Sequence, residues 1–357
     1  MTISLCMIVR DEEDVLARCL NSAANLFSEI VIVDTGSRDR TRDIALGFTP
    51  NVYDFEWIDD FSAARNFAFS KATGDYLMWL DADDVIEGEN RRLFEELFRD
   101  IERKRPDVVM LPYNVGFDGD RVTLSYERER ILRANAGFWF EGEVHEAVPP
   151  HGKIIHGRAA VSHRKLCVKS STRNLDIFEN MRRRGVIFSP RNCYYYAREL
   201  RWAGRLEESA EWYEKCAHDN HAWIENRVSA QFELSTLLYE LGERERSDNE
   251  LGRCLMMAEP RADVCCEVGR RYLERGELWA AKFWYELAPK QFARPLGGFL
   301  HADYGGYIPY LQLCVVHDRL GEWETARRYN ELAGEIRSDS EAVRKNREYF
   351  AGLDGKR

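Results

Sequence analysis

Hydrophobic residues follow two different patterns along the chain, and the change lies near residue 165. In the first part, short apolar runs alternate with segments whose apolar residues recur at helical spacing. Strands are expected at 3–9, 29–34, 52–57, 76–80, 108–112 and 121–126. Helices are expected after Asp11, which would cap the first of them, and at 42–46 and 61–71. Strands that alternate with helices predict an α/β fold with a mostly parallel sheet.

From residue 166 onward the pattern is helical, and it contains a repeat. A glycine separates two helical segments four times, and small residues follow each glycine five and twelve positions later. The glycines are Gly204, Gly242, Gly276 and Gly321; the small residues are Ser209, Ser247, Ala281 and Ala326, then Cys216, Cys254, Ala288 and Ala333. A glycine lets the chain reverse, and small residues let two helices pack closely.

This spacing resembles tetratricopeptide-like helical hairpins, with a plain helical bundle as the alternative. We therefore predict two domains. Residues 1–165 would form an α/β domain, and residues 166–357 would form an all-α helical repeat domain.

Composition and charge exclude some classes of function. A net charge of −10 over 357 residues argues against a nucleic-acid partner. The nine cysteines are scattered without a CxxC pair, which favours a reduced, cytoplasmic compartment. We see no signal peptide, and the apolar runs are too short for a transmembrane helix.

The candidate chemistry lies where the fourth expected strand ends. Asp81 and Asp83 follow Leu80, and Asp34 ends the second strand. The carboxyl ends of parallel strands form the ligand-binding edge of such a sheet. Clustered carboxylates there suit a hard divalent ion, Mg²⁺ or Mn²⁺, carrying the phosphates of a nucleotide. A lone DxD is more often a solvated loop end, and Asp84 could equally cap the next helix.

Four motifs carry a resemblance to a family, and a fifth motif, FEGEVHE, is typical of a subgroup of that family. They are ISLCMIVRDEE (3–13), IVDTGSRDRT (32–41), FSAARN (61–66), GDYLMWLDADD (74–84) and FEGEVHE (140–146). In order and spacing they resemble family 2 glycosyltransferases with the GT-A fold. The chain is also similar to a bacterial subgroup that fuses this domain to tetratricopeptide repeats and includes the peptide S-glycosyltransferases of glycocin pathways.

The resemblance implies roles for single residues. On the donor side, the loop with Val9, Arg10 and Glu12 would border the base of the nucleotide, together with Asp34 and Ser37. Further donor-binding positions implied by the motifs are Arg65, Asp81, Ala82 and His145. Arg65 would contact a phosphate or hold Asp81. Asp83, Asp81 and His163 would bind the metal, although the His-x-Gly-Tyr motif typical of the subgroup is missing around His163.

The implied reaction is a sugar transfer that inverts the anomeric centre. A carboxylate would deprotonate the acceptor, and Glu146 is the first candidate, with Glu143 second. Both follow an aromatic pair that could raise the pKa of a nearby carboxyl by desolvation. The alternative for this segment is a solvated strand face, since Glu141, Glu143 and His145 alternate.

The expected donor is a UDP-sugar, and the expected acceptor is a peptide or protein bound partly by the helical domain. The helices could instead form a homodimer interface or brace the catalytic domain. Two other functions compete: a transferase for a surface polysaccharide or lipid-linked acceptor, and a non-catalytic repeat scaffold with a degenerate transferase domain.

Overall fold

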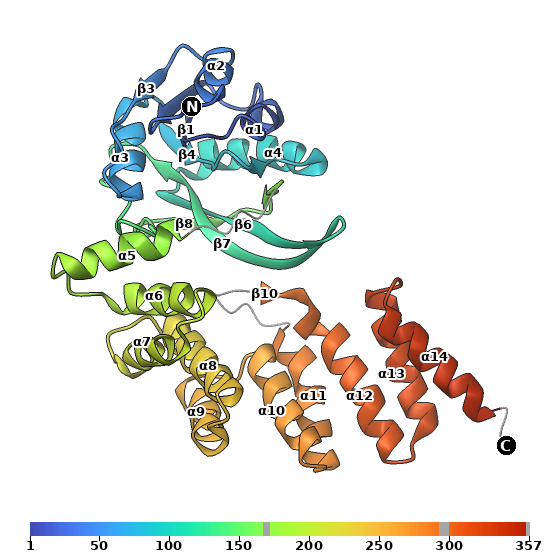
Figure 1. Cartoon of the computed structure of the whole chain (residues 1–357). Helices are drawn as coiled ribbons and strands as arrows, with labels where there is room; N and C mark the ends of the chain where they lie inside the picture. The colour runs from blue at the N-terminus through green and yellow to red at the C-terminus, as the bar shows by residue number, and fades with distance from the viewer. Residues whose placement is uncertain (167–171, 293–299, 355–357) are drawn as a thin grey trace. The chain divides into compact units, whose positions relative to one another are not determined.

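The computed structural model describes residues 1–166, 172–292 and 300–354. The chain divides into two compact units, Met1–Ile187 and Phe188–Arg357 (Figure 1). The predicted domain boundary at 165/166 adjoins residues 167–171, which lie outside the described residues, and it stays a prediction.

The first unit is an α/β structure. Its strands are β1 (Ile3–Val9), β2 (Glu29–Asp34), β3 (Val52–Asp54), β4 (Tyr76–Trp79), β5 (Asp84–Val85), β6 (Val108–Asp118), β7 (Arg121–Arg133), β8 (Ile154–His156) and β9 (Val161–His163). Its helices are α1 (Leu16–Ala23), α2 (Thr41–Leu46), α3 (Phe61–Lys71), α4 (Gly88–Lys104) and α5 (Arg173–Arg183).

The sheet of this unit has a parallel half and a mixed half, in which β6 pairs in parallel with β8 and β9 and antiparallel with β7. Its strand order is β3-β2-β1-β4-β7-β6-β9-β5, and β8 pairs with β6. The first four strands in this order are mutually parallel, whereas β7 runs antiparallel to both β4 and β6. The expected strands at 108–112 and 121–126 are longer than predicted, because β6 and β7 form one extended antiparallel pair.

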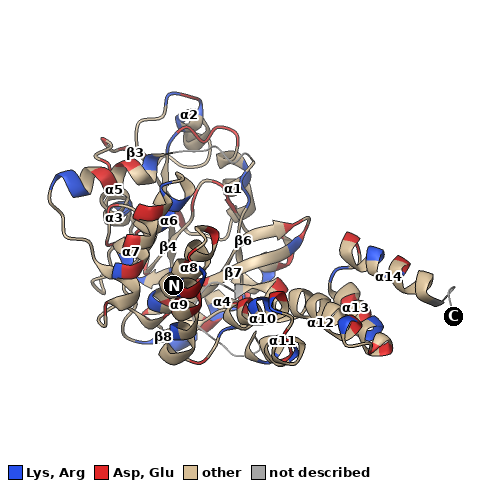
Figure 2. Cartoon of the chain, turned by 60° about the horizontal axis from the view of Figure 1, so that its bottom comes forward, with Lys and Arg blue, Asp and Glu red and all other residues tan. Residues whose placement is uncertain are grey.

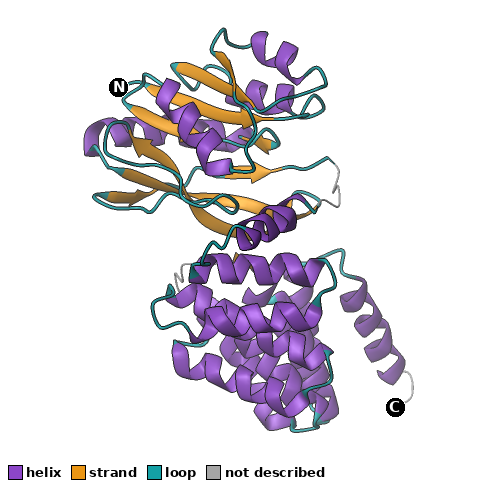
Figure 3. Cartoon of the chain, turned by 60° about the vertical axis from the view of Figure 1, so that its left-hand side comes forward, coloured by secondary structure: helices purple, strands orange, loops and turns teal. Residues whose placement is uncertain are grey.

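Both faces of the parallel part of the sheet are covered, which explains why β1, β2 and β4 are mostly apolar. On β1, Leu5 and Met7 pack with residues of α1 and α4, such as Leu20 and Phe94. Cys6, between them, faces the opposite side and packs with residues of α3. Figure 3 shows helices on both sides of these strands. The carboxyl ends of β1, β2 and β4 are left at one edge of this two-sided core.

Helix α1 begins later than the sequence indicates. Its first residue is Leu16, and its N-cap residue, Val15, makes no side-chain cap. The prediction that Asp11 caps it was wrong, because Asp11 has a positive φ of 53° and its carboxylate accepts from Arg38 N at 2.7 Å. This residue therefore joins the loops after β1 and β2 instead of starting a helix.

The second unit consists mainly of helical hairpins. Its helices are α6 (Pro190–Trp202), α7 (Leu206–His218), α8 (Ile224–Glu240), α9 (Arg244–Met257), α10 (Ala262–Glu274), α11 (Leu278–Phe292), α12 (Tyr307–Arg319), α13 (Trp323–Ile336) and α14 (Glu341–Asp354). A short strand β10 (Leu300–His301) and a 3-10 turn (Ala302–Gly305) precede α12. Acidic and basic side chains are interspersed along these helices (Figure 2).

The structure confirms the repeat that the spacing predicts. Gly204, Gly242, Gly276 and Gly321 lie between paired helices and have φ of 77°, 84°, 78° and 77°, a region that favours glycine. The four residues five positions later are fully buried, and those twelve positions later are also buried. Ser247 is one example: it donates to Ser235 O at 2.7 Å where α8 and α9 cross. In the described part of the chain, no helix is long and apolar enough to cross a membrane.

Candidate active site

The site is built at the edge where β1, β2 and β4 end, and hydrogen bonds join the loops there. Asp11 N donates to Ser37 Oγ at 3.1 Å, and Thr35 N donates to Val9 O at 3.0 Å. Glu12 N donates to Thr41 Oγ1 at 2.7 Å. The predicted donor-side residues on the first two loops are therefore brought together as one wall.

Asp34 supports that wall from below. Its side chain is nearly buried, and Oδ1 accepts from Gly36 N at 2.9 Å and from Ser37 N at 2.8 Å. Gly36 has a φ of 100° and open space around its missing side chain. This carboxylate thus shapes the turn that presents Ser37. Val9 is buried, and Arg10 is exposed at the rim.

An ion-pair triad stands at the end of β4. Arg65, on α3, donates through Nη2 to Asp81 Oδ1 and through Nε to Glu146 Oε1, each at 2.6 Å. Its side chain is only 8% exposed, against 30% for Asp81 and 12% for Glu146. The guanidinium also lies 4.8 Å from the centre of the Trp79 ring and 5.3 Å from that of Phe140. Of the two roles expected for Arg65, the structure shows the one that holds Asp81.

This pairing keeps Asp81 ionised. Burial works to raise the pKa of the Asp81 carboxyl, but the nearby Arg65 and Arg130 guanidiniums outweigh it and hold that pKa well below its usual range. Burial likewise works against the charge of Arg65, whose pKa is nevertheless raised by Asp81 and Glu146. A carboxylate that binds a cation must be deprotonated and held in place, and Asp81 meets both conditions.

His163, on β9, closes the acidic end of β4. Its Nδ1 lies 3.1 Å from Asp83 Oδ1 and 3.1 Å from Asp84 Oδ1. Burial alone would lower the pKa of this imidazole, but the hydrogen bonds with both carboxylates raise it to about 9. Ligand atoms of Asp81, Asp84 and His163 lie within 4.8 Å of one another, so these groups could hold a metal ion.

Asp84 was expected either to cap a helix or to touch the ion, and the first alternative was wrong. It pairs with His163 in the strand ladder, is fully buried, and receives hydrogen bonds from Tyr113 OH at 2.9 Å and from Arg130 Nη1 at 3.1 Å. It also accepts from Asp81 N at 3.0 Å. Its partners fix it in place, while Asp83 keeps a side chain that is 19% exposed. Ala82, between the metal candidates, is buried.

The two candidate bases lie in a tight loop rather than on a strand face. Glu141 and Ala147 exchange backbone hydrogen bonds at 2.9 and 3.2 Å, which closes the loop. Gly142 and His145 both have positive φ, of 98° and 51°. The alternative of an alternating, solvated strand is therefore wrong.

Within that loop the structure separates Glu143 from Glu146. Glu143 forms an ion pair with Arg184 just after α5, and its carbonyl accepts from Phe61 N at 2.9 Å. Glu146 belongs to the Arg65 triad. His145 stacks against Phe178 of α5, with ring centroids 6.2 Å apart. His145 is therefore in contact with α5.

Sequence reasoning missed the arginines of β7. Arg130 has no exposed surface and lies 3.8 Å from the centre of the Trp79 ring; Arg128 lies 4.8 Å from the same ring. Arg128 pairs with Glu129 at 3.1 Å. The available signal was the run ERER at 127–130, placed directly before an apolar end of a strand. Charged residues in a buried strand need partners of opposite charge. The partners of Arg130 and Arg128 are Asp84 and Glu129, which lie in or beside the candidate site.

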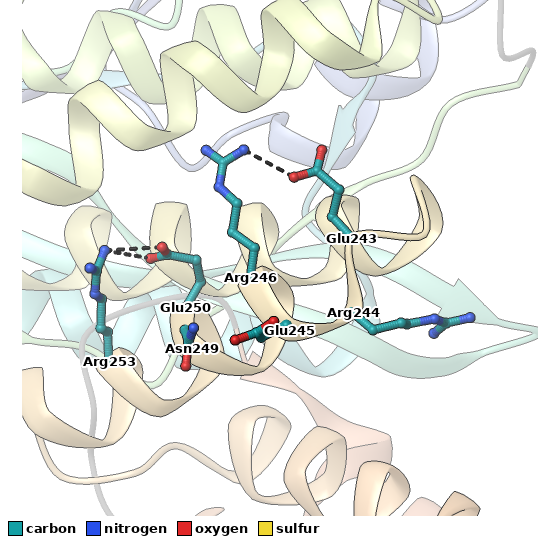
Figure 4. A pocket seen from close by; sticks show the side chains of 7 residues that line it. All are labelled: Glu243, Arg244, Glu245, Arg246, Asn249, Glu250 and Arg253. Carbon is teal, nitrogen blue, oxygen red and sulfur yellow. Dashed lines mark hydrogen bonds and ion pairs between the residues drawn. The ribbon is translucent and has the colours of Figure 1, made fainter.

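A pocket in the second unit lies along the first turns of α9. Glu243, Arg244, Glu245, Arg246, Asn249, Glu250 and Arg253 line it. Figure 4 shows ion pairs between these residues: Arg246 with Glu243 at 3.2 Å and Arg253 with Glu250 at 3.0 Å. Three arginines face three glutamates, so the lining has no net charge to attract a phosphate. We therefore keep the candidate site at the strand ends.

The candidate site lies in the part of the chain that a family model matches. The family model described as glycosyl transferase family 2 matches residues 4–164. Glycosyltransferase SunS of Bacillus subtilis is 29% identical over 256 residues, which cover 67% of this chain and 59% of SunS. A TPR repeat-containing protein of Synechococcus elongatus is 52% identical over 84 residues, covering 24% of this chain and 21% of that protein.

Among solved structures, S. aureus TarS 1-349 aligns with a TM-score of 0.37 at 12% identity, over 95% of this chain and 92% of TarS 1-349. That score is too low to support an argument. The alignments with the two curated relatives cover about three fifths of the length of SunS and about one fifth of the length of the TPR protein. The predicted resemblance to family 2 glycosyltransferases is confirmed over residues 4–164, and the chain is also similar to a TPR repeat-containing protein.

Proposed function

We propose, from the premise that residues 4–164 form a family 2 glycosyltransferase domain, that the chain moves a sugar from a nucleoside-diphosphate sugar to an acceptor. One observation carries the proposal. Arg65 holds Asp81 of the DxD segment and Glu146 of the following loop in a single buried triad. Donor-side and acceptor-side carboxylates are thereby fixed next to each other at the ligand-binding edge of the sheet.

The residues present fit a divalent cation, Mg²⁺ or Mn²⁺. Carboxylate oxygens and an imidazole nitrogen gather in one place, and the acidic groups outnumber their arginine partners. Asp81, His163 and the buried Asp84 have ligand atoms within 4.8 Å of one another, and Asp83, whose Oδ1 lies 3.1 Å from His163 Nδ1, would complete the set that holds the ion. When bound, the cation stabilises the charge that grows on the departing diphosphate.

The transfer itself needs one bond made and one broken. An acceptor oxygen or sulfur forms a bond with C1 of the sugar, the bond from C1 to the diphosphate oxygen breaks, and its electron pair leaves with the nucleoside diphosphate. The acceptor proton passes to a carboxylate. Glu146 and Glu143 both remain candidates for this base. Glu146 Oε1 is engaged by Arg65, so Oε2 would receive the proton there.

The acceptor is the finer part of the proposal. We propose a peptide or protein side chain, supported by the similarity to SunS and by the helical hairpins of the second unit, a type of array that offers extended binding surfaces. A polysaccharide or lipid-linked acceptor is the competing proposal. A UDP-sugar as donor, a cytoplasmic location and a homodimer remain predictions.

The test is a donor screen on the full chain. UDP-, GDP- and dTDP-sugars are incubated with and without Mn²⁺, and the released nucleoside diphosphate is measured. We expect release from one donor class, dependent on metal and lost in Asp83→Asn. If no donor is bound or hydrolysed under any condition, the scaffold function replaces the enzymatic one. Adding synthetic peptides with Cys, Ser, Thr or Asn, and separately a lipid-linked primer, then identifies the acceptor class by mass spectrometry.

A further inference from the structure

We propose that Arg130 is a positioning residue: it closes the DxD loop (residues 80–83) and thereby sets how tightly the candidate site binds a divalent cation. This inference rests on the proposed function, because the cation belongs to that function. It assigns a task to a residue of β7 whose partners the sequence alone does not indicate.

The Arg130 guanidinium joins the two ends of the DxD loop. Its Nη1 donates to Trp79 O and to Asp84 Oδ2, each at 3.1 Å. Trp79 is the last residue of β4 and Asp84 is the first residue of β5, so the loop lies between these two acceptors. One nitrogen atom thus fixes the distance that the DxD loop has to span.

Asp84 passes this constraint on to Asp81. The oxygen that accepts from Arg130, Oδ2, also accepts from Asp81 N at 3.0 Å, and Asp84 N donates to Asp81 O at 3.1 Å. The other oxygen of Asp84, Oδ1, accepts from Tyr113 OH at 2.9 Å. The backbone of Asp81 is therefore held by a carboxylate that Arg130 and Tyr113 orient. Groups that orient the ligands of a metal tune the affinity of the site for that metal.

Two aromatic rings pack on the Arg130 guanidinium and keep it in place. Its central carbon lies 3.8 Å from the centre of the Trp79 ring and 4.1 Å from the centre of the Tyr113 ring. The side chain has no exposed surface, and neither has that of Asp84. Because the group that orients the loop is already fixed by packing, little ordering is left to be done when a cation binds.

The hydrogen bonds of Arg130 do not fit a purely stabilising task. Among the described residues, its Nε and Nη2 have no hydrogen-bond partner, although both atoms are buried. Buried donors without acceptors cost stability, and well-packed apolar side chains often replace a buried ion pair without loss. The contacts that Nη1 makes at the two ends of the DxD loop therefore account for this arginine better than its contribution to the core does.

The direction of the effect distinguishes positioning from charge. Arg130 carries a positive charge beside Asp84, so by electrostatics alone its removal should strengthen the binding of a cation. Positioning predicts the opposite result. A DxD loop whose ends are no longer joined presents its carboxylates in many arrangements, and the cation must then select the few that suit it.

The experiment titrates the full chain with Mn²⁺ and follows free Mn²⁺ by electron paramagnetic resonance, alone and with UDP, GDP or dTDP. Arg130→Met should weaken the affinity for Mn²⁺ by about 10- to 100-fold. Tyr113→Phe keeps the ring and the charges but removes the hydroxyl that donates to Asp84, and it should weaken the affinity by at least about threefold.

Arg133→Met is the matched control, since it deletes the same charge from the same strand. Arg133 stands opposite Tyr76 at the other end of β4, and it pairs with Asp107 at 3.3 Å. Its replacement should leave the affinity for Mn²⁺ within twofold of the wild type. Thermal midpoints above the assay temperature show that each variant is folded, so that a change of affinity reports on the site and not on unfolding.

The outcomes separate this inference from the function beneath it. If the wild type binds Mn²⁺ and folded Arg130→Met binds it within threefold or more tightly, the inference is overturned, and the transferase function, which the donor screen tests, stands. If Arg130→Met does not fold, Tyr113→Phe decides, and an unchanged affinity overturns the inference. If the wild type binds no Mn²⁺, alone or with any of the three diphosphates, the cation of the proposed function is overturned together with this inference.

Discussion

Replacing Arg65 by methionine removes the one cation that Asp81 and Glu146 share. Both carboxylates then remain at short range from each other, with at most 30% of either side chain exposed. Methionine fills most of the volume but supplies no charge and no donor. The variant therefore tests whether the triad, which is part of the candidate site, is also a structural support.

The expected loss of stability follows from this geometry. Removing one partner of a buried ion pair typically costs about 3–5 kcal/mol, because a charge is left without compensation. The contacts of the guanidinium with Trp79 and Phe140 are lost as well, and such contacts contribute about 0.5–2 kcal/mol when desolvated. The terms share one side chain and do not add in full. We therefore expect the first unit to lose about 3–5 kcal/mol at pH 7.

The pKa shift of Asp81 predicts how the stability difference between wild type and Arg65→Met changes with pH. The folded-state pKa of Asp81 is depressed, so its contribution is complete above the unfolded value near 4 and is lost as the pH falls through the folded value. The difference between wild type and Arg65→Met should thus be full at pH 7. It should shrink as the pH falls below about 4, where the Asp81 carboxyl takes up a proton, first in the unfolded chain and then in the folded protein.

Hydrogen exchange is the suitable assay, since two units need not unfold in one step. Amide protection in α3 and β4 should fall in Arg65→Met, while protection in α10 should not change. Arg42→Met, which breaks the exposed pair with Asp54, should change protection by less than about 1 kcal/mol. If Arg65→Met keeps wild-type protection in α3 at pH 7, the triad is not a structural support and our reasoning about it is refuted.

Three further outcomes are expected. Asp83→Asn should reduce metal-dependent release of the nucleoside diphosphate by at least about 100-fold without lowering the thermal midpoint, and unchanged turnover would exclude Asp83 as a ligand. Gly74→Ala places a Cβ 2.6 Å from Ser4 Oγ and 2.9 Å from Ser4 N, so it should cost about 1–3 kcal/mol in thermal denaturation, whereas Gly88→Ala meets nothing within 4 Å and should be neutral. Ser247→Leu should destabilise the second unit by about 1–3 kcal/mol in urea, and a neutral result would mean that α8 and α9 do not pack closely there.

The parts of the fold that sequence predicts well are those set by local periodicity. The turn glycines of the second unit and the small residues after them recur at fixed offsets because each hairpin repeats one packing problem. The strand ends with Asp34 and Asp81 were equally visible, since an apolar run that stops at a carboxylate marks the edge of a sheet.

What sequence could not give is the partner of each charge. Nothing in the spacing of Arg65 and Glu146, 81 positions apart, indicates that they meet at 2.6 Å. The misplaced start of α1 has a similar cause, because Asp11 is a good capping residue whose carboxylate is instead used by a loop from β2. Such pairings depend on the tertiary fold, which brings separate loops to one edge.

The charge balance at the end of β4 adds to the case for a cation that the DxD segment makes. In the described part of the chain, five carboxylates gather at the end of β4 and the neighbouring strands: Asp81, Asp83, Asp84, Glu129 and Glu146. Three guanidiniums pair with them, those of Arg65, Arg128 and Arg130, and the His163 imidazole, whose pKa is raised to about 9, adds a fourth positive charge beside Asp83 and Asp84. Five negative charges against four positive ones leave an excess of one negative charge. Because most of these groups are shielded from water, an uncompensated excess would be costly, and a bound cation is the arrangement that balances it.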